Sequence, residues 1–313
     1  MAQWDIQHVM LDLKQARQDW RKSQQRLREM GGRELPSKQQ LKNILNQLCG
    51  ILFPMRLGPA DLRQETEDHY IAYSLDRVLS DLLQQVKLTL AYRQKYHQAI
   101  DTGTVSQSDW QNNLSRHAED IVQDFANNLA KIRRLIDADV AAAYRGDPAA
   151  HSVDEVLLCY PGIFAMIYHR ISHQLYPDVP LLSRVISELA HSATGIDIHP
   201  GAQIGQGCFI DHGTGVVIGE TCIIGERVRI YQAVTLGAKR FELTEAGQLK
   251  KDYARHPIIE NDVVIYAGAT LLGRITIGEG STIGGNVWLT HSVPANSSIM
   301  QSPTASQQKS KST

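Results

Sequence analysis

The spacing of apolar side chains changes once along the chain, near Ala193. Before this point apolar residues recur every three or four positions, which is the spacing of one face of an amphipathic helix. Two of these stripes are long, from Ile71 to Leu90 and from Ile121 to Val140, and shorter ones predict helices over about 3–29, 37–48, 153–175 and 181–192. The sequence therefore predicts an α-helical N-terminal domain over residues 1–193.

After Ala193 the period becomes six. A ladder of Ile and Leu residues follows this spacing, with two breaks: Ile198, Ile204, Ile210, Ile218, Ile224, Ile230, Leu236, Ile259, Ile265, Leu271, Ile277, Ile283 and Leu289. A hexapeptide repeat of this kind is typical of a left-handed parallel β-helix, in which three hexads form one triangular coil around an aliphatic interior. We predict such a β-helix over 194–294, so the fold class of the whole chain is α+β. Residues 295–313 are too polar to offset the entropy of ordering and are predicted to form a disordered tail.

The two breaks in the ladder are the places where function is expected. The first is a two-residue slip between Ile210 and Ile218, in the segment 211–215. The second is an expelled loop, within 238–256, after which the ladder resumes in step. Long loops in a regular scaffold are usually functional.

Composition excludes several classes of function. The chain has 313 residues, 42% of them apolar, and a net charge of −1, which argues against nucleic acid or a membrane surface as a partner. No apolar stretch is long enough for a signal peptide or a membrane span, so a cytoplasmic location is expected. The four cysteines form no CxxC pair, and no phosphate loop, dinucleotide fingerprint or nucleophile elbow is present.

A histidine stands in the first break. His212 follows Asp211 in a glycine-rich corner, and Asp197 lies fifteen residues earlier, nearly one coil away. A carboxylate beside an imidazole can fix its tautomer and stabilise its protonated form, as activation of an alcohol requires. The alternative is that Asp197 and His212 only satisfy hydrogen bonds of turns.

A second pair, Arg255 and His256, closes the expelled loop. An arginine there could hold a substrate carboxylate by two parallel hydrogen bonds, and the alternative is a solvated loop end. Asp147, before the helix expected from about residue 153, is typical of a turn or a helix cap. Cys208 and Cys222 fall on inward positions and are expected to fill the core.

Four motifs together resemble those of the serine O-acetyltransferases: DIHPGAQIG at 197–205, DHGTGVVIGET at 211–221, IYQAVTLG at 230–237 and RHP at 255–257. The resemblance implies an enzyme that transfers acetyl from acetyl-CoA to the hydroxyl of L-serine, giving O-acetyl-L-serine for cysteine biosynthesis. No metal is expected.

The resemblance also implies roles for individual residues. His212 would be the general base, oriented by Asp197. Asp147 and Asp211 would hold the amino group of serine, and Arg255 and His256 its carboxylate end. Gly237, Ala238, Ala267 and Gly285 match positions where this family lays the pantetheine arm of CoA, and small residues suit that role because the ligand must approach the backbone closely.

Partners are expected on the same grounds. One prism offers no deep cleft, so we expect a homotrimer or a dimer of trimers with active sites between adjacent prisms. L-cysteine is expected as a feedback inhibitor. Family members that dock into the sulfhydrylase end in isoleucine, whereas this chain ends in Thr313, so we expect no stable sulfhydrylase complex.

Three other functions are weighed against this one. Another hexapeptide acyltransferase could act on a different small amino acid or on a sugar. A carbonic anhydrase of the γ type would bind zinc with three histidines on the same prism, but His199, His212 and His256 lack the required spacing. A catalytically silent scaffold is disfavoured because the DH and RHP motifs are intact.

Overall fold

The structure, a computed structural model, describes residues 4–24, 34–97, 107–245 and 247–301. The chain divides into two compact units, Met1–Leu35 and Pro36–Thr313. The described part of the first unit holds helix α1 (Ile6–Ser23), which begins where the Asp5 side chain accepts a hydrogen bond from the backbone N–H of His8. No residue of α1 is buried.

The second unit begins with the remaining helices. They are α2 (Lys38–Leu52), α3 (Pro54–Leu57), the short 3₁₀ helix η1 (Gln64–Thr66), α4 (Glu67–His97), α5 (Gln107–Gly146), α6 (Val153–Cys159), α7 (Pro161–Leu175) and α8 (Pro180–Thr194). The predicted helical half is therefore confirmed, and α8 ends one residue past the predicted domain boundary. The single helix predicted over 153–175 is wrong, because the chain leaves the helix at Tyr160 and Pro161 starts a new one. In the described ranges no helix is both long and apolar enough to cross a membrane.

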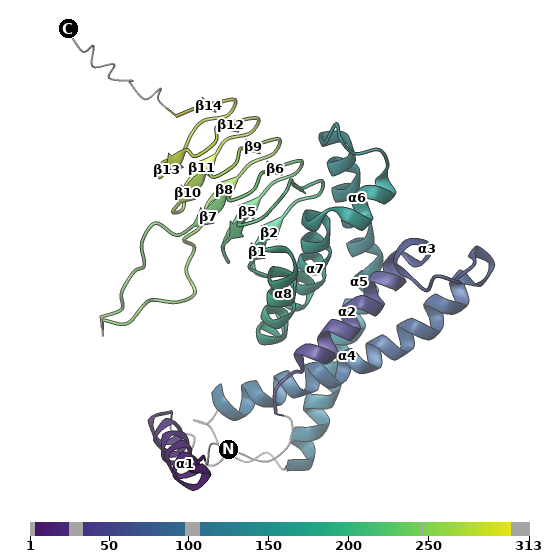
Figure 1. The fold of residues 1–313 in the computed structure, drawn as a ribbon, viewed down its shortest axis with the longest axis vertical. Helices are drawn as coiled ribbons and strands as arrows, with labels where there is room; N and C mark the ends of the chain where they lie inside the picture. Colours follow the sequence, from purple (N-terminus) through teal and green to yellow (C-terminus); the bar gives the residue numbers. More distant parts are fainter. Residues whose placement is uncertain (1–3, 25–33, 98–106, 246, 302–313) are drawn as a thin grey trace. The chain divides into compact units, whose positions relative to one another are not determined.

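The β-helix follows as three parallel sheets (Figure 1). Sheet A contains β1 (Asp197–Ile198), β4 (Val217–Ile218), β7 (Thr235–Gly237), β10 (Thr270–Leu272) and β13 (Trp288–Leu289). Sheet B contains β2 (Gln203–Ile204), β5 (Ile223–Ile224), β8 (Ile258–Ile259) and β11 (Thr276–Ile277). Sheet C contains β3 (Phe209–Ile210), β6 (Arg229–Ile230), β9 (Val264–Ile265), β12 (Thr282–Ile283) and β14 (Ser298–Ile299). The predicted left-handed β-helix is confirmed.

The register of sheet A records both breaks in the ladder. Ile198 pairs with Ile218, a step of 20 residues, whereas Ile218 pairs with Leu236, the regular step of 18. Leu236 then pairs with Leu271, a step of 35 that is one regular coil plus the 17 residues of the expelled loop. The slip and the loop thus leave the stacking of the aliphatic interior intact, as the sequence predicted.

The end of the ladder was predicted too early. Val293 bridges to Ile277, and Ile299 pairs with Ile283, both over 16 residues. The last turn is therefore two residues short. Its paired residues, Val293 and Ile299, do not follow the six-residue spacing that continues from Leu289. The predicted disordered tail over 295–313 is wrong for residues 295–301. Residues 302–313 lie outside the described residues, and so does Thr313, on which the sulfhydrylase prediction rests.

The helices pack against the prism at an interface around α7, which we call the joint. Two hydrophobic cores meet at α7, because Ala165 and Met166 belong to the interior of the prism while Phe209 of β3 belongs to the helical core. Gly162, in the first turn of α7, lies so close to the carbonyl of Ile210 that no side chain fits there. Helix α7 therefore packs directly against the first coil.

A buried ion pair stabilises this joint. The guanidinium of Arg170 on α7 contacts both carboxylate oxygens of Asp139 on α5, at 3.1 and 3.2 Å. It also donates to the carbonyls of Ile204 and Gly205 in the first coil, and Asp139 accepts from the backbone N–H of Cys208. Asp139 is fully buried and Arg170 is 6% exposed. The pair thus connects two helices to one coil by buried hydrogen bonds.

Asp139→Ala should lower the free energy of unfolding by about 3–5 kcal/mol, because removal of one partner leaves a buried, uncompensated charge. Asp137→Ala is the matched control on the same helix, where the ion pair with Arg133 is exposed, and it should cost no more than about 1 kcal/mol. Urea unfolding of the two variants measures the difference. Equal losses would contradict the role given to the buried pair.

Candidate functional site

The corner between sheets C and A carries His212, in the turn that joins β3 to β4. His212, Gly213 and Gly215 all have positive φ, at 59°, 78° and 77°. Glycine adopts this conformation without strain, and at Gly213 a side chain would also collide with Ile196. The turn therefore bulges outward, and the imidazole of His212 is 69% exposed.

Beside His212 lies a buried carboxylate, that of Asp211. One of its oxygens is 3.6 Å from Nδ1 of His212, and the other accepts from Nη2 of Arg229 at 2.8 Å. The guanidinium of Arg229 lies between the rings of Phe209 and Tyr231, with its central carbon 4.9 and 4.7 Å from their centroids. Arg229 thus fixes Asp211 in place. Sequence reasoning missed this residue.

Asp147 reaches the same corner from the C-terminal end of α5. One carboxylate oxygen accepts from the backbone N–H of Ala149, which confirms the predicted turn, and the other accepts from the hydroxyl of Tyr160. The Tyr160 hydroxyl bond lowers the pKa of Asp147 most, and the charges of Arg229 and His212 lower it further. Asp147, Asp211 and His212 therefore form one electrostatic group, and Tyr160 is a second residue that the sequence did not indicate.

Asp197 starts β1, one coil below the His212 turn, and pairs with Val217 of β4. Its carboxylate lies within 4.8 Å of ligand atoms of Glu188 and His191. Among the described residues His212 forms an ion pair with Asp211 but none with Asp197. The single chain therefore places Asp197 near this corner without bringing it to the imidazole, and its orienting role stays a prediction.

The corner between sheets A and B carries the second predicted pair. Arg255 forms an ion pair with Glu220 at 2.6 Å, and Nδ1 of His256 accepts from the backbone N–H of Thr221 at 3.1 Å. The ring of His256 packs over Gly219, where any side chain would collide with it. Burial, with the nearby charge of Arg255, lowers the pKa of His256 to about 4. His256 is therefore neutral at physiological pH.

These two groups lie at opposite ends of the sheet A strands. Between Gly215 and Glu220 the chain passes along β4, and at about 3.3 Å per residue the two corners are roughly 15 Å apart. The predicted CoA positions divide in the same way: Gly237 ends β7 and Ala238 follows it at the A–B corner, and Ala267 and Gly285 lie at the C–A corner. One chain thus presents two half-sites rather than a closed site.

The structure also shows where the cysteines and the three histidines of the alternative zinc site lie. Cys208 and Cys222 are fully buried in the prism, as predicted, and burial raises the pKa of each thiol to about 12. His212 lies at a different corner from His199 and His256. Within the described ranges, the one group of three residues with metal-ligand spacing is Glu188, His191 and Asp197, which includes none of these three histidines.

The structure belongs to a recognisable class. Residues 256–291 match the family model for the bacterial transferase hexapeptide of six repeats, and the coils and their corner residues define a hexapeptide-repeat transferase. The chain is 57% identical to the "Serine acetyltransferase, plasmid" of Synechococcus elongatus over 268 residues, which cover 85% of this chain and 82% of that protein.

Solved structures agree. Serine acetyltransferase 1 of Entamoeba histolytica in complex with L-cysteine superimposes with a TM-score of 0.68 at 38% identity, covering 82% of this chain and 85% of that one. A soybean serine acetyltransferase complexed with serine gives 0.51 at 29% identity, covering 84% and 97%. The chain belongs to the serine acetyltransferase family. It is therefore an enzyme that transfers acetyl to serine in cysteine biosynthesis.

The neutral histidines of the A–B corner make stability depend on pH. Burial and the charge of Arg184 lower the pKa of His199 to about 4, and its Nδ1 accepts from the backbone N–H of Gly201. In the unfolded chain the histidine pKa is about 6.5, so between about 6.5 and 4 protons bind the unfolded state preferentially. The free energy of unfolding should therefore fall as the pH is lowered through this window.

His199→Asn keeps an acceptor for Gly201 but cannot titrate, so it should lose less stability than the wild type between pH 7 and pH 5. His291→Asn, at an exposed position, should behave as the wild type does. Urea unfolding at both pH values tests this. An unchanged pH dependence in His199→Asn would contradict the assignment.

Proposed function

We propose that the chain transfers acetyl from acetyl-CoA to the hydroxyl of L-serine with His212 as the general base. The observation that carries this proposal is the exposed imidazole of His212 beside the fixed carboxylate of Asp211, 3.6 Å from its Nδ1. With Nδ1 facing a carboxylate, Nε2 is the nitrogen free to accept the serine proton. The serine oxygen then attacks the thioester carbonyl, and the tetrahedral intermediate expels the CoA thiolate, which takes the proton back from the imidazolium.

Substrate binding divides between the two half-sites. Asp147 and Asp211 supply negative charge at the His212 corner, which suits the ammonium group of serine. Arg255 and His256 supply donors at the other corner, which suit a carboxylate. The guanidinium of Arg255 is held between Glu220 and the carbonyl of Tyr253, so it is oriented before substrate arrives.

We propose further that the site is completed by a second copy of the chain. The half-sites are too far apart for one serine molecule to contact both in one chain. A ring with a heterologous interface places the His212 corner of one prism against the Arg255 corner of the next. A homotrimer is the smallest such ring, and the pantetheine arm would lie between Gly237 and Ala238 of one copy and Ala267 and Gly285 of its neighbour.

L-cysteine shares the α-amino and carboxylate groups of serine, so the same two half-sites suit it as an inhibitor. The Entamoeba histolytica relative carries L-cysteine in its structure, which supports this proposal.

Asp197 is proposed to orient His212 from the adjacent coil. Asp197→Asn should then lower kcat with little effect on the KM for serine.

His212→Ala should lower kcat by about 10²–10⁴-fold, which is what loss of a general base costs, while CoA binding stays intact. Release of CoA with L-serine as acceptor gives the rate, and titration with CoA gives the dissociation constant. His291→Ala is the control for loss of an exposed histidine. Turnover of His212→Ala above a tenth of the wild-type value would contradict the proposal.

A further inference from the structure

The expelled loop between β7 and β8 folds on itself. Leu243 and Leu249 form an antiparallel bridge, and Lys250 forms an ion pair with Glu242 at 2.9 Å. The hydroxyl of Tyr253 accepts from the backbone N–H of Glu242 and donates to the carbonyl of Arg240. These contacts close the loop on itself, and a cavity of about 350 Å³, which we call the loop pocket, lies at its base.

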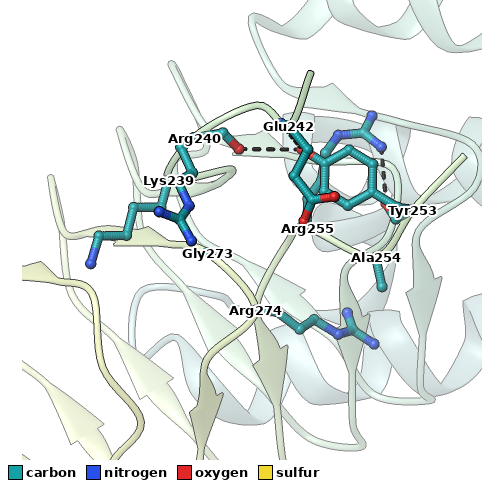
Figure 2. A pocket seen from close by; sticks show the side chains of 8 residues that line it. All are labelled: Lys239, Arg240, Glu242, Tyr253, Ala254, Arg255, Gly273 and Arg274. Atoms are coloured by element: carbon teal, nitrogen blue, oxygen red, sulfur yellow. Dashed lines mark hydrogen bonds between the residues drawn. The ribbon is translucent and has the colours of Figure 1, made fainter. Parts of the chain in front are cut away.

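Positive charge dominates the loop pocket. Figure 2 shows the residues that line it: Lys239, Arg240, Glu242, Tyr253, Ala254, Arg255, Gly273 and Arg274. The one acidic side chain, Glu242, is already neutralised by Lys250, and Arg255 is paired with Glu220. Lys239 and Arg240 form no ion pair with any residue that the structure describes. The pocket therefore holds cationic charge that nothing on this part of the chain compensates.

One of these cations is held in place. Arg274 donates to the carbonyls of Thr221 and His256, at 2.6 and 2.9 Å, which orients its guanidinium without cancelling the charge. Lys239 passes over Gly273, which has φ 92° and where a side-chain carbon would lie 3.2 Å from Cβ of Lys239. The bare backbone of Gly273 thus leaves room for the base of the Lys239 side chain.

We propose that the loop pocket binds a phosphate group. A phosphate carries about −1.5 to −2 charge near neutral pH, and it suits the donors of guanidinium and ammonium groups. Two sources share this chemistry: the 3′-phosphate of the acetyl-CoA donor and free inorganic phosphate. The first source rests on the proposed function, and it suits the position of the pocket, whose first lining residue, Lys239, directly follows Ala238.

The double variant Lys239→Ala, Arg240→Ala tests the proposal. Both side chains are exposed, so the fold should be unaffected. Lys251→Ala is the matched control, because it removes one charge from the same loop but does not line the pocket. Each protein is titrated with inorganic phosphate at low ionic strength. Each is also assayed for kcat/KM with acetyl-CoA and with the same thioester lacking the 3′-phosphate.

The double variant should bind inorganic phosphate about tenfold more weakly than the control, as expected for loss of a charge-assisted contact. If the donor supplies the phosphate, kcat/KM should also fall about tenfold for acetyl-CoA and remain unchanged for the donor without the 3′-phosphate. If the double variant binds inorganic phosphate more weakly and its kcat/KM changes equally for the two donors, free phosphate is the ligand.

The proposal is overturned if the double variant matches Lys251→Ala in both the titration and the donor assays. A different result would contradict the proposed function: a wild-type protein that transfers no acetyl to serine from either donor. The phosphate titration does not depend on that result.

Discussion

Stacking of the aliphatic ladder constrains everything else in this molecule. Each hexad buries one Ile or Leu against its copy a coil away, so the chain can leave the prism only if it returns in register. Both departures obey this condition, since Ile198 reaches Ile218 and Leu236 reaches Leu271 without loss of pairing. The two corners with chemical groups are therefore held by the interior of the prism, although their own backbones are irregular.

The buried pair of Asp139 and Arg170 extends this constraint to the helices. Arg170 donates to carbonyls of the first coil, and Asp139 lies eight residues before Asp147 along the chain. Fixing α5 against the first coil consequently places Asp147 and its partner Tyr160 at the His212 corner. Half of the proposed ammonium site thus comes from the helical part of the chain, and it depends on packing at the joint.

Much of this architecture could be predicted because it is periodic. The six-residue spacing indicated the coils, the slip and the expelled loop, and the motifs around His212 and Arg255 marked both corners. Arg229 was missed because it occupies an outward strand position with no local signal, and its contact with Asp211 forms only when coils stack. Tyr160 was missed because its bond to Asp147 crosses a helix boundary. The last strand was missed because a shortened turn changes the phase of the repeat.

The central claim is that one copy supplies the His212 corner and another supplies the Arg255 corner of each site. It is tested most directly by mixing His212→Ala and Arg255→Ala proteins, unfolding them together and refolding them into mixed rings. Random assembly leaves about one quarter of the sites with both corners intact, whatever the size of the ring. We predict that the mixture recovers about a quarter of wild-type acetyl transfer to serine, although each variant alone is nearly inactive. A mixture no more active than the two variants refolded separately would contradict the account.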